Sequence, residues 1–178
     1  ATLGENTEKV LTFQSCSKTY AMTGWRIGYT AGDEKVIQAM GKLQGQSTSC
    51  PCSIAQVAAT EALIGDQSEV AIMRNIFKKR RDYIVNRLNK MNGVHCDNPG
   101  GAFYVFPDIS NLINRNVAGK IIKTALDLCL IILEAKSVVS VAGNSFGANN
   151  NIRFSYATSE DIINEAMNRL EEVILDCN

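Results

Sequence analysis

The longest periodic segment of the sequence restricts the fold more than any other feature. Apolar residues recur at intervals of three, four and seven between Val70 and Met91, and Gly93 follows them. This spacing gathers the apolar side chains in one stripe on an α-helix, and glycine is favoured just beyond a helix end. The sequence therefore predicts one long helix with a single apolar face.

Short strand-like and helix-like segments alternate on both sides of this helix. Strands are expected at residues 10–13, 24–32, 94–96, 102–106, 137–141 and 151–156. Further helices are expected from Asp33, from Ser49 and Pro51 to about Leu63, over residues 117–134, and after a capping Ser159. Such alternation, without internal repeats, predicts an α/β or α+β arrangement with a boundary near Gly65 or inside the long helix.

Charge and hydropathy exclude several classes of partner. The 18 basic and 18 acidic side chains give a formal charge of +0, so neither nucleic acid nor a membrane surface is an expected partner. The run Lys78–Arg81 is interpreted as a solvated helix face. The longest purely apolar run, Leu128–Leu133, is far too short to span a membrane. With no secretory signal visible, a cytoplasmic location is expected.

The cysteines and the histidine suggest no metal site. The six cysteines are irregularly spaced, which favours free thiols in a reducing compartment over a disulfide framework. His95 is the only histidine, so a metal site or a Ser-His-Asp triad would depend on that residue alone. We expect an ordinary structural histidine and no bound metal.

Lys18 and Arg26 stand eight residues apart in a segment of small and apolar residues. Desolvation of the Lys18 amine would lower its pKa and free it as a nucleophile or base. Arg26 lies near two glycines, where its planar fork suits a phosphate or carboxylate, and Ser15 could add a hydroxyl donor. By themselves, these residues are compatible with an anion-binding lysine site and equally with an ordinary surface lysine and arginine.

The segment SCSKTYAMTGWRIGYTAG resembles the pyridoxal-phosphate lysine signature of the class I aminotransferases. The segments MGKLQGQSTS, SIAQVAATEAL, GAFYVFP and IRFSYATS look like the bacterial-type aspartate aminotransferase subgroup, so the resemblance covers nearly the whole chain. It implies the carboxy-terminal part of a fold type I transferase. Residues 1–65 would end the large α/β cofactor domain, and residues 66–178 would form a long connecting helix and an α+β small domain.

The resemblance also implies roles for particular residues. Lys18 would hold pyridoxal 5'-phosphate as a Schiff base and later shuttle the proton between the substrate α-carbon and the C4′ atom of the cofactor. Ser15 and Arg26 would hold the cofactor phosphate, and Arg153 would bind the substrate α-carboxylate as a bidentate pair. The implied reaction transfers an amino group between an amino acid, aspartate by this resemblance, and a 2-oxo acid, 2-oxoglutarate.

Relatives in this family are well over twice as long, and the resemblance leads us to expect that their amino-terminal part is lacking. The family's active site lies at a homodimer interface. Two positions depart from the subgroup pattern: Cys50 replaces a common Asn and Ala142 a usual Pro. Two alternatives therefore stay open beside transamination: a catalytically silent carboxy-terminal fragment, and a related pyridoxal-phosphate lyase or decarboxylase.

Overall fold

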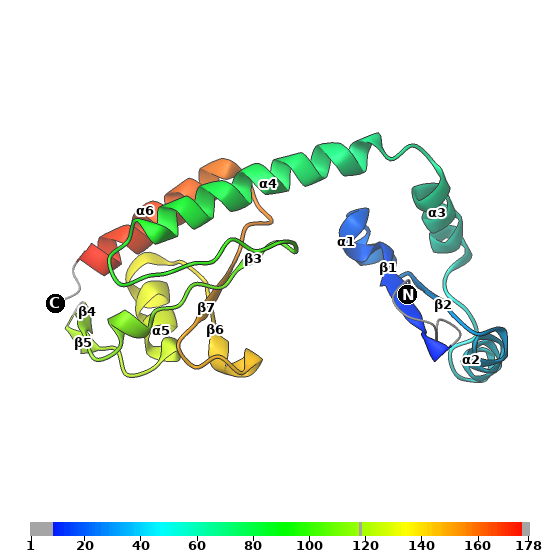
Figure 1. The fold of residues 1–178 in the computed structure, drawn as a ribbon, viewed down its shortest axis with the longest axis horizontal. Coiled ribbons are helices and arrows are strands. Elements are labelled where there is room, and N and C mark those ends of the chain that lie inside the picture. Colours follow the sequence, from blue (N-terminus) through cyan, green and yellow to red (C-terminus); the bar gives the residue numbers. More distant parts are fainter. Residues whose placement is uncertain (1–8, 118, 176–178) are drawn as a thin grey trace. The chain divides into compact units, whose positions relative to one another are not determined.

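The computed structural model describes residues 9–117 and 119–175 and divides the chain into two compact units, Ala1–Ile72 and Met73–Asn178 (Figure 1). Unit 1 contains β1 (Thr12–Ser15), α1 (Cys16–Thr19), the 3₁₀ turn η2 (Thr23–Trp25), β2 (Gly28–Ala31), α2 (Glu34–Ser47) and α3 (Ser53–Ile64). Helix α4 (Ser68–Asn89) begins in unit 1 and continues into unit 2. Unit 2 adds β3 (Tyr104–Val105), η3 (Ser110–Leu112), β4 (Asn116–Val117), β5 (Lys120–Ile121), α5 (Ala125–Lys136), β6 (Val141–Ala142), η4 (Gly143–Phe146), β7 (Ile152–Ser155) and α6 (Glu160–Leu175).

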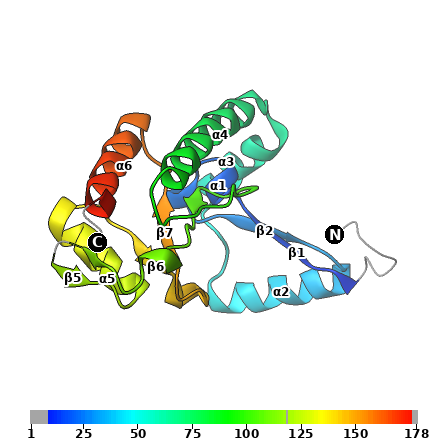
Figure 2. The same ribbon diagram turned by 60° about the vertical axis from the view of Figure 1, so that its left-hand side comes forward.

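Unit 1 is built on the antiparallel pair β1 and β2, which Figure 2 shows running side by side. Thr12 lies opposite Ala31, and Ser15 lies opposite Gly28. A Cβ atom at Gly28 would stand 2.7 Å from the carbonyl oxygen of Gln14, so only glycine allows this close approach of the strands.

The helices of unit 1 bury little of their surface. Asp33 caps α2 by accepting hydrogen bonds from the backbone of Lys35 and Val36, yet no residue of α2 is buried. The unit has a small core made of Cys16, Met22, Ile27, Ala55 and Ala59.

Unit 2 closes a continuous core of its own. Its three-stranded antiparallel sheet has the order β3-β7-β6, and α4, α5 and α6 supply many of the buried side chains. The predicted stripe of α4 contributes Ile84 and Leu88, which are 1% and 0% exposed. Helix α6 begins after Ser159 as predicted, because the Ser159 hydroxyl accepts a hydrogen bond of 3.4 Å from the backbone of Ile162.

Arg87 ties α4 to α6 on the surface of this core. Its guanidinium donates to Asn164, Asn168 and Glu171, each within 2.9 Å, and to the Tyr83 hydroxyl at 2.9 Å. Partial burial alone would lower the pKa of Arg87, but the Tyr83 hydroxyl and the Glu171 carboxylate together raise it. The two helices are therefore fixed side by side.

The strand predicted at residues 24–32 is wrong in its first half. Thr23–Trp25 form a 3₁₀ turn, and Arg26 adopts a left-handed conformation with φ +52°, so only Gly28–Ala31 extend as a strand. The predicted start of α3 is wrong too. Ser49 has φ +65° and cannot cap, and the helix begins after Cys52.

The helix predicted at residues 117–134 begins later. Residues 116–117 and 120–121 pair as the hairpin β4–β5 instead. Thr124 and Asp127 form a capping box, which fixes the start of α5 at Ala125. The segments predicted as strands at 94–96 and 137–141 have mostly irregular backbone, with one bridge from His95 to Asp108 and strand geometry only from Val141.

The remaining expectations concern the cysteines, the histidine, metal ligands and membrane-spanning helices. The five cysteines in the described residues are free, and Cys177 lies outside them. His95 is exposed and its ring contacts Asp97 at 3.2 Å. In residues 9–117 and 119–175, no three potential ligand side chains of His, Cys, Asp or Glu gather as a metal site, and no helix is long and apolar enough to cross a membrane.

Candidate functional site

Lys18 lies in the single turn of helix α1, directly after strand β1. Ser15 caps this turn, and its Oγ accepts a hydrogen bond of 3.1 Å from the backbone of Ser17. Cys16 is the one buried residue of the turn and anchors it in the core of unit 1. Lys18 itself is exposed in this chain. A helix of a single turn can bury only one face, and in α1 that face carries Cys16 and not Lys18.

Ser15 is held beside the residue that follows Arg26. The backbone N–H of Cys16 donates to the carbonyl of Ile27 at 3.3 Å, and the Ser15 hydroxyl lies 3.4 Å from the same carbonyl oxygen. The strand register therefore brings the Ser15 turn and Arg26 together, although eleven positions separate them in the sequence.

Arg26 occupies a strained backbone position. One residue before the 3₁₀ turn, Ala21, and one after it, Arg26, have φ values of +53° and +52°. For residues with a side chain this conformation costs about 1–3 kcal/mol, and such strain gathers at functional sites. The guanidinium donates to the Thr23 carbonyl at 2.8 Å, which holds the side chain over its own turn and leaves further N–H groups for another acceptor. This turn was not predicted from the sequence, in which Gly24 is the local residue that favours a turn.

Arg26 also lines a cavity of about 790 Å³ within unit 1, together with the start of α3. Cys52, at the N-cap of that helix, lines the same cavity. The backbone N–H groups of Ala55 and then Ile54 lower the pKa of the exposed Cys52 thiol. This thiol was not among the predicted site residues.

Arg153 lies in β7 of unit 2, opposite Val141 of β6. Its Cζ atom stands 4.3 Å from the centre of the Tyr104 ring and 4.6 Å from the centre of the Phe146 ring. No ion pair with a carboxylate is found for Arg153 in the part of the chain that the structure describes. The half-buried cation is thus held by aromatic rings.

The four predicted site residues therefore fall into two sets. Ser15, Lys18 and Arg26 are brought together by one strand pair and its turns in unit 1. Arg153 belongs to unit 2.

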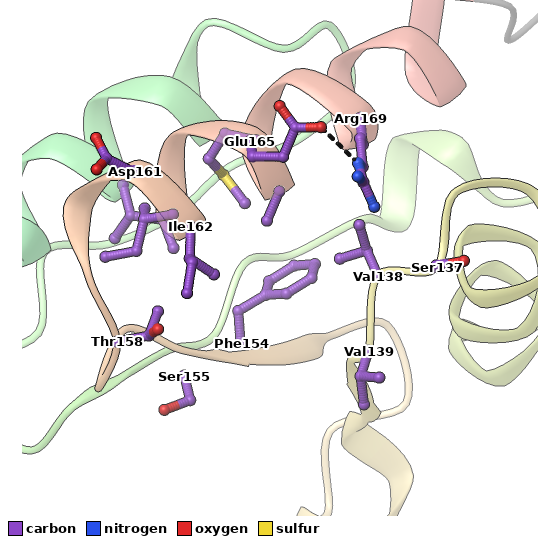
Figure 3. A pocket seen from close by; sticks show the side chains of 14 residues that line it. Ser137, Val138, Val139, Phe154, Ser155, Thr158, Asp161, Ile162, Glu165 and Arg169 are labelled. Atoms are coloured by element: carbon purple, nitrogen blue, oxygen red, sulfur yellow. Dashed lines mark hydrogen bonds and ion pairs between the residues drawn. The ribbon is translucent and has the colours of Figure 1, made fainter.

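A second cavity, of about 660 Å³, opens between β7, α6 and the 137–139 segment (Figure 3). Phe154 points into it, whereas Arg153, the preceding residue of β7, is not one of its lining residues. Glu165 and Arg169 at its rim form an ion pair of 2.8 Å. None of the predicted site residues lines this cavity.

Comparison with known proteins identifies the family of the chain. The family model described as aminotransferase class I and II matches residues 1–170. The chain belongs to this family. Within the family, it is 48% identical over 165 residues to an aspartate/prephenate aminotransferase of Cereibacter sphaeroides, covering 92% of this chain and 41% of that protein.

Solved aminotransferase structures show the same fold. The aspartate aminotransferase of Rhizobium meliloti matches with a TM-score of 0.93 and 42% identity, over 97% of this chain and 43% of that one. A Thermus thermophilus aspartate aminotransferase variant matches with a TM-score of 0.83 and 36% identity, over 94% and 44%. The chain thus spans about two fifths of the relatives it matches, and the predicted carboxy-terminal part of a fold type I transferase is confirmed.

Class I aminotransferases depend on pyridoxal 5'-phosphate. The residues of unit 1 fit that group. They offer an exposed lysine, a hydroxyl and a guanidinium with N–H groups to spare, all on adjoining turns. An arginine and a serine hydroxyl are suitable donors for a phosphate dianion.

Proposed function

We propose that Ser15, Lys18 and Arg26 hold pyridoxal 5'-phosphate in an aminotransferase that exchanges the amino group of aspartate with 2-oxoglutarate. One observation carries the proposal. The β1–β2 register sets the capping turn of Ser15 against the residue after Arg26, with Lys18 one turn further on. A phosphate held between Ser15 and Arg26 would leave the aldehyde end of the same small molecule to Lys18.

Each of these residues contributes a distinct physical property. Arg26 carries a permanent charge and a planar set of donors, and its backbone turn restricts where that charge points. Ser15 contributes a short hydroxyl donor fixed by its cap. The bound cofactor supplies an electron sink for the bond broken at the substrate α-carbon. Lys18 Nζ would hold the cofactor and, once displaced as a free amine, would take the proton from that carbon.

Arg153 supplies the second anion site of the proposal. Its guanidinium has no carboxylate partner within the described residues, so its N–H fork can receive the α-carboxylate of an amino acid as a bidentate pair. An arginine also discriminates a planar carboxylate better than a lysine would, because its donors are fixed in one plane.

The choice of aspartate follows from the relatives, whose names specify aspartate or aspartate and prephenate. We also propose a cytoplasmic homodimer. Free thiols suit a reducing compartment. Association is supported by the exposed apolar side chains Leu43, Ile54 and Val57 on α2 and α3, which are 69–73% exposed.

A catalytically silent role for this stretch of chain remains the second candidate. Its support is that the chain covers only 41% of a relative that it matches over 92% of its own length. In that case the cofactor site would need further residues from elsewhere, and the 178 residues by themselves would turn over no amino acid.

The experiment uses the protein in its longest natural form, incubated with pyridoxal 5'-phosphate. We expect the visible absorbance band of a lysine-bound cofactor, and loss of that band in Lys18→Ala but not in Lys42→Ala, which changes an exposed lysine of α2. Formation of oxaloacetate from aspartate with 2-oxoglutarate supports amino transfer. Release of ammonia or carbon dioxide instead indicates the lyase or decarboxylase alternative. A Lys18→Ala protein that keeps the band overturns the proposal.

A further inference from the structure

The guanidinium of Arg153 contacts aromatic rings of unit 2 that in turn contact one another. Ring contacts connect Phe77 to Phe103 at 6.5 Å, Phe103 to Tyr104 at 4.4 Å, and Phe106 to Phe146 at 6.1 Å. The Arg153 guanidinium lies over the Tyr104 and Phe146 rings and thus joins these two groups of rings.

Resting on the proposed function, we propose that Tyr104 and Phe146 are positioning residues that hold the Arg153 guanidinium ready for a carboxylate. Their faces attract the cation without occupying its N–H groups. A carboxylate partner from the chain would also fix the side chain, but it would fill the fork that the ligand needs.

Tyr104 is fixed by the sheet. It pairs with Ser155 in the β3–β7 register, so its backbone lies two residues along from Arg153 on the neighbouring strand. Phe103 packs against the Tyr104 ring at an interplanar angle of 46°. The position of the Tyr104 ring is therefore fixed by the sheet and by the packing of unit 2.

Phe146 is fixed by the turn that ends η4. Phe106 meets the Phe146 ring edge-on, at 88°. The turn is tied down because Gly143 N donates to Asn151 O at 2.7 Å and the Asn151 side chain donates to Phe106 O at 3.0 Å. A Cβ atom at Gly143 would lie 2.6 Å from Asn151 O and 3.0 Å from the Phe106 ring, so glycine permits this close packing.

The test uses the full 178-residue chain and the NMR signal of the Arg153 Nε–H group, assigned with Arg153→Lys. In the wild-type chain, ring currents should shift this signal away from that of Arg74, an exposed arginine of α4. Succinate should move the signal further, and sodium chloride at equal ionic strength should not.

Single substitutions Tyr104→Leu and Phe146→Leu should each reduce the ring-current shift and weaken succinate binding about twofold to fivefold. Tyr104→Phe keeps the ring and should bind as the wild type does. Phe13→Leu, at an exposed aromatic in unit 1, is the matched control and should change nothing.

The proposal is overturned if the wild-type Arg153 signal matches that of Arg74, if the leucine variants bind succinate like the wild type, or if Tyr104→Phe loses as much as Tyr104→Leu. The first of these outcomes needs no variant, so the proposal can be overturned even when a leucine variant fails to fold. Repeating the titration in Lys18→Ala separates the two proposals, because Arg153 must still bind there even if Lys18 never holds a cofactor.

Discussion

The two units of the chain bury apolar surface to very different extents. Unit 2 encloses 26 buried residues in one cluster, whereas the described part of unit 1 encloses five. Helix α2 has no buried residue, and α3 exposes Ile54 and Val57. Burial of apolar area is the main favourable term in folding, so unit 2 should be the more stable of the two units. Arg153, the proposed carboxylate-binding residue, lies in unit 2, whereas the proposed cofactor residues lie in unit 1.

Hydrogen exchange on the intact chain should show the largest effect of this difference. Amides of α5 and of the Ile84–Leu88 part of α4 should exchange about a thousandfold more slowly than those of α2, because opening the unit 2 core requires near-global unfolding. Mass spectrometry of exchanged peptides measures this. Equal protection in α2 and α5 would contradict the comparison.

Matched leucine substitutions should repeat the contrast at single residues. Leu128 in α5 is 0% exposed and Leu43 in α2 is 73% exposed. We expect Leu128→Ala to lower the free energy of unfolding by about 2–5 kcal/mol, through lost burial and a residual cavity. Leu43→Ala should change it by less than about 0.5 kcal/mol. Urea denaturation followed by circular dichroism measures both values, and similar values would argue against a difference in packing.

Two glycines provide a smaller contrast. A Cβ atom at Gly143 would collide with Ala148 O and crowd Asn151 O, whereas at Gly24 it would meet nothing within 4 Å. Gly143→Ala should therefore destabilise unit 2 by about 1–3 kcal/mol. Gly24→Ala should stay within about 0.5 kcal/mol. The same denaturation measurement serves, and a harmless Gly143→Ala would mean that the turn carrying Phe146 is loosely packed.

Cysteine alkylation should show the smallest effect. The exposed Cys52 has a lowered pKa in the folded chain because the Ala55 and Ile54 N–H groups stabilise its thiolate, whereas burial raises the pKa of Cys96 and Cys129. A depressed pKa stabilises the folded state above the unfolded thiol's pKa, and this contribution is lost as pH falls through the folded pKa. Iodoacetamide should therefore modify Cys52 at lower pH in native protein than in urea.

Peptide mass spectrometry follows each site, with Cys96 and Cys129 as the internal controls in unit 2. These two should react in urea and only slowly in native protein. An identical pH midpoint for Cys52 in native and unfolded chain would remove the proposed effect of the α3 start.

The sequence predicted the elements with strong periodicity and failed where local geometry decided. The α4 stripe and the Ser159 start of α6 were found, because apolar spacing and a capping residue are local signals. The left-handed Arg26 and the β4–β5 hairpin were missed. Both depend on turns whose residues also suit other conformations.

The candidate site was predictable only in part. The resemblance predicted site roles for Lys18, Ser15, Arg26 and Arg153, and these roles stay predictions. The structure adds how three of these residues share one strand pair. The rings around Arg153 and the Cys52 thiol were missed, because they meet their neighbours through packing between segments far apart in the sequence. Periodicity carries no information about such contacts.

The most direct test of the central claim is to find where pyridoxal 5'-phosphate attaches. The protein is incubated with the cofactor, reduced with borohydride and mapped by peptide mass spectrometry. We predict labelling of Lys18 about tenfold above Lys35 and Lys42, exposed lysines of the same unit, since hydrogen bonds to a charged group contribute about 1.5–3 kcal/mol. Arg26→Ala should remove that preference. Equal labelling of the three lysines, or a preference that survives Arg26→Ala, would contradict it.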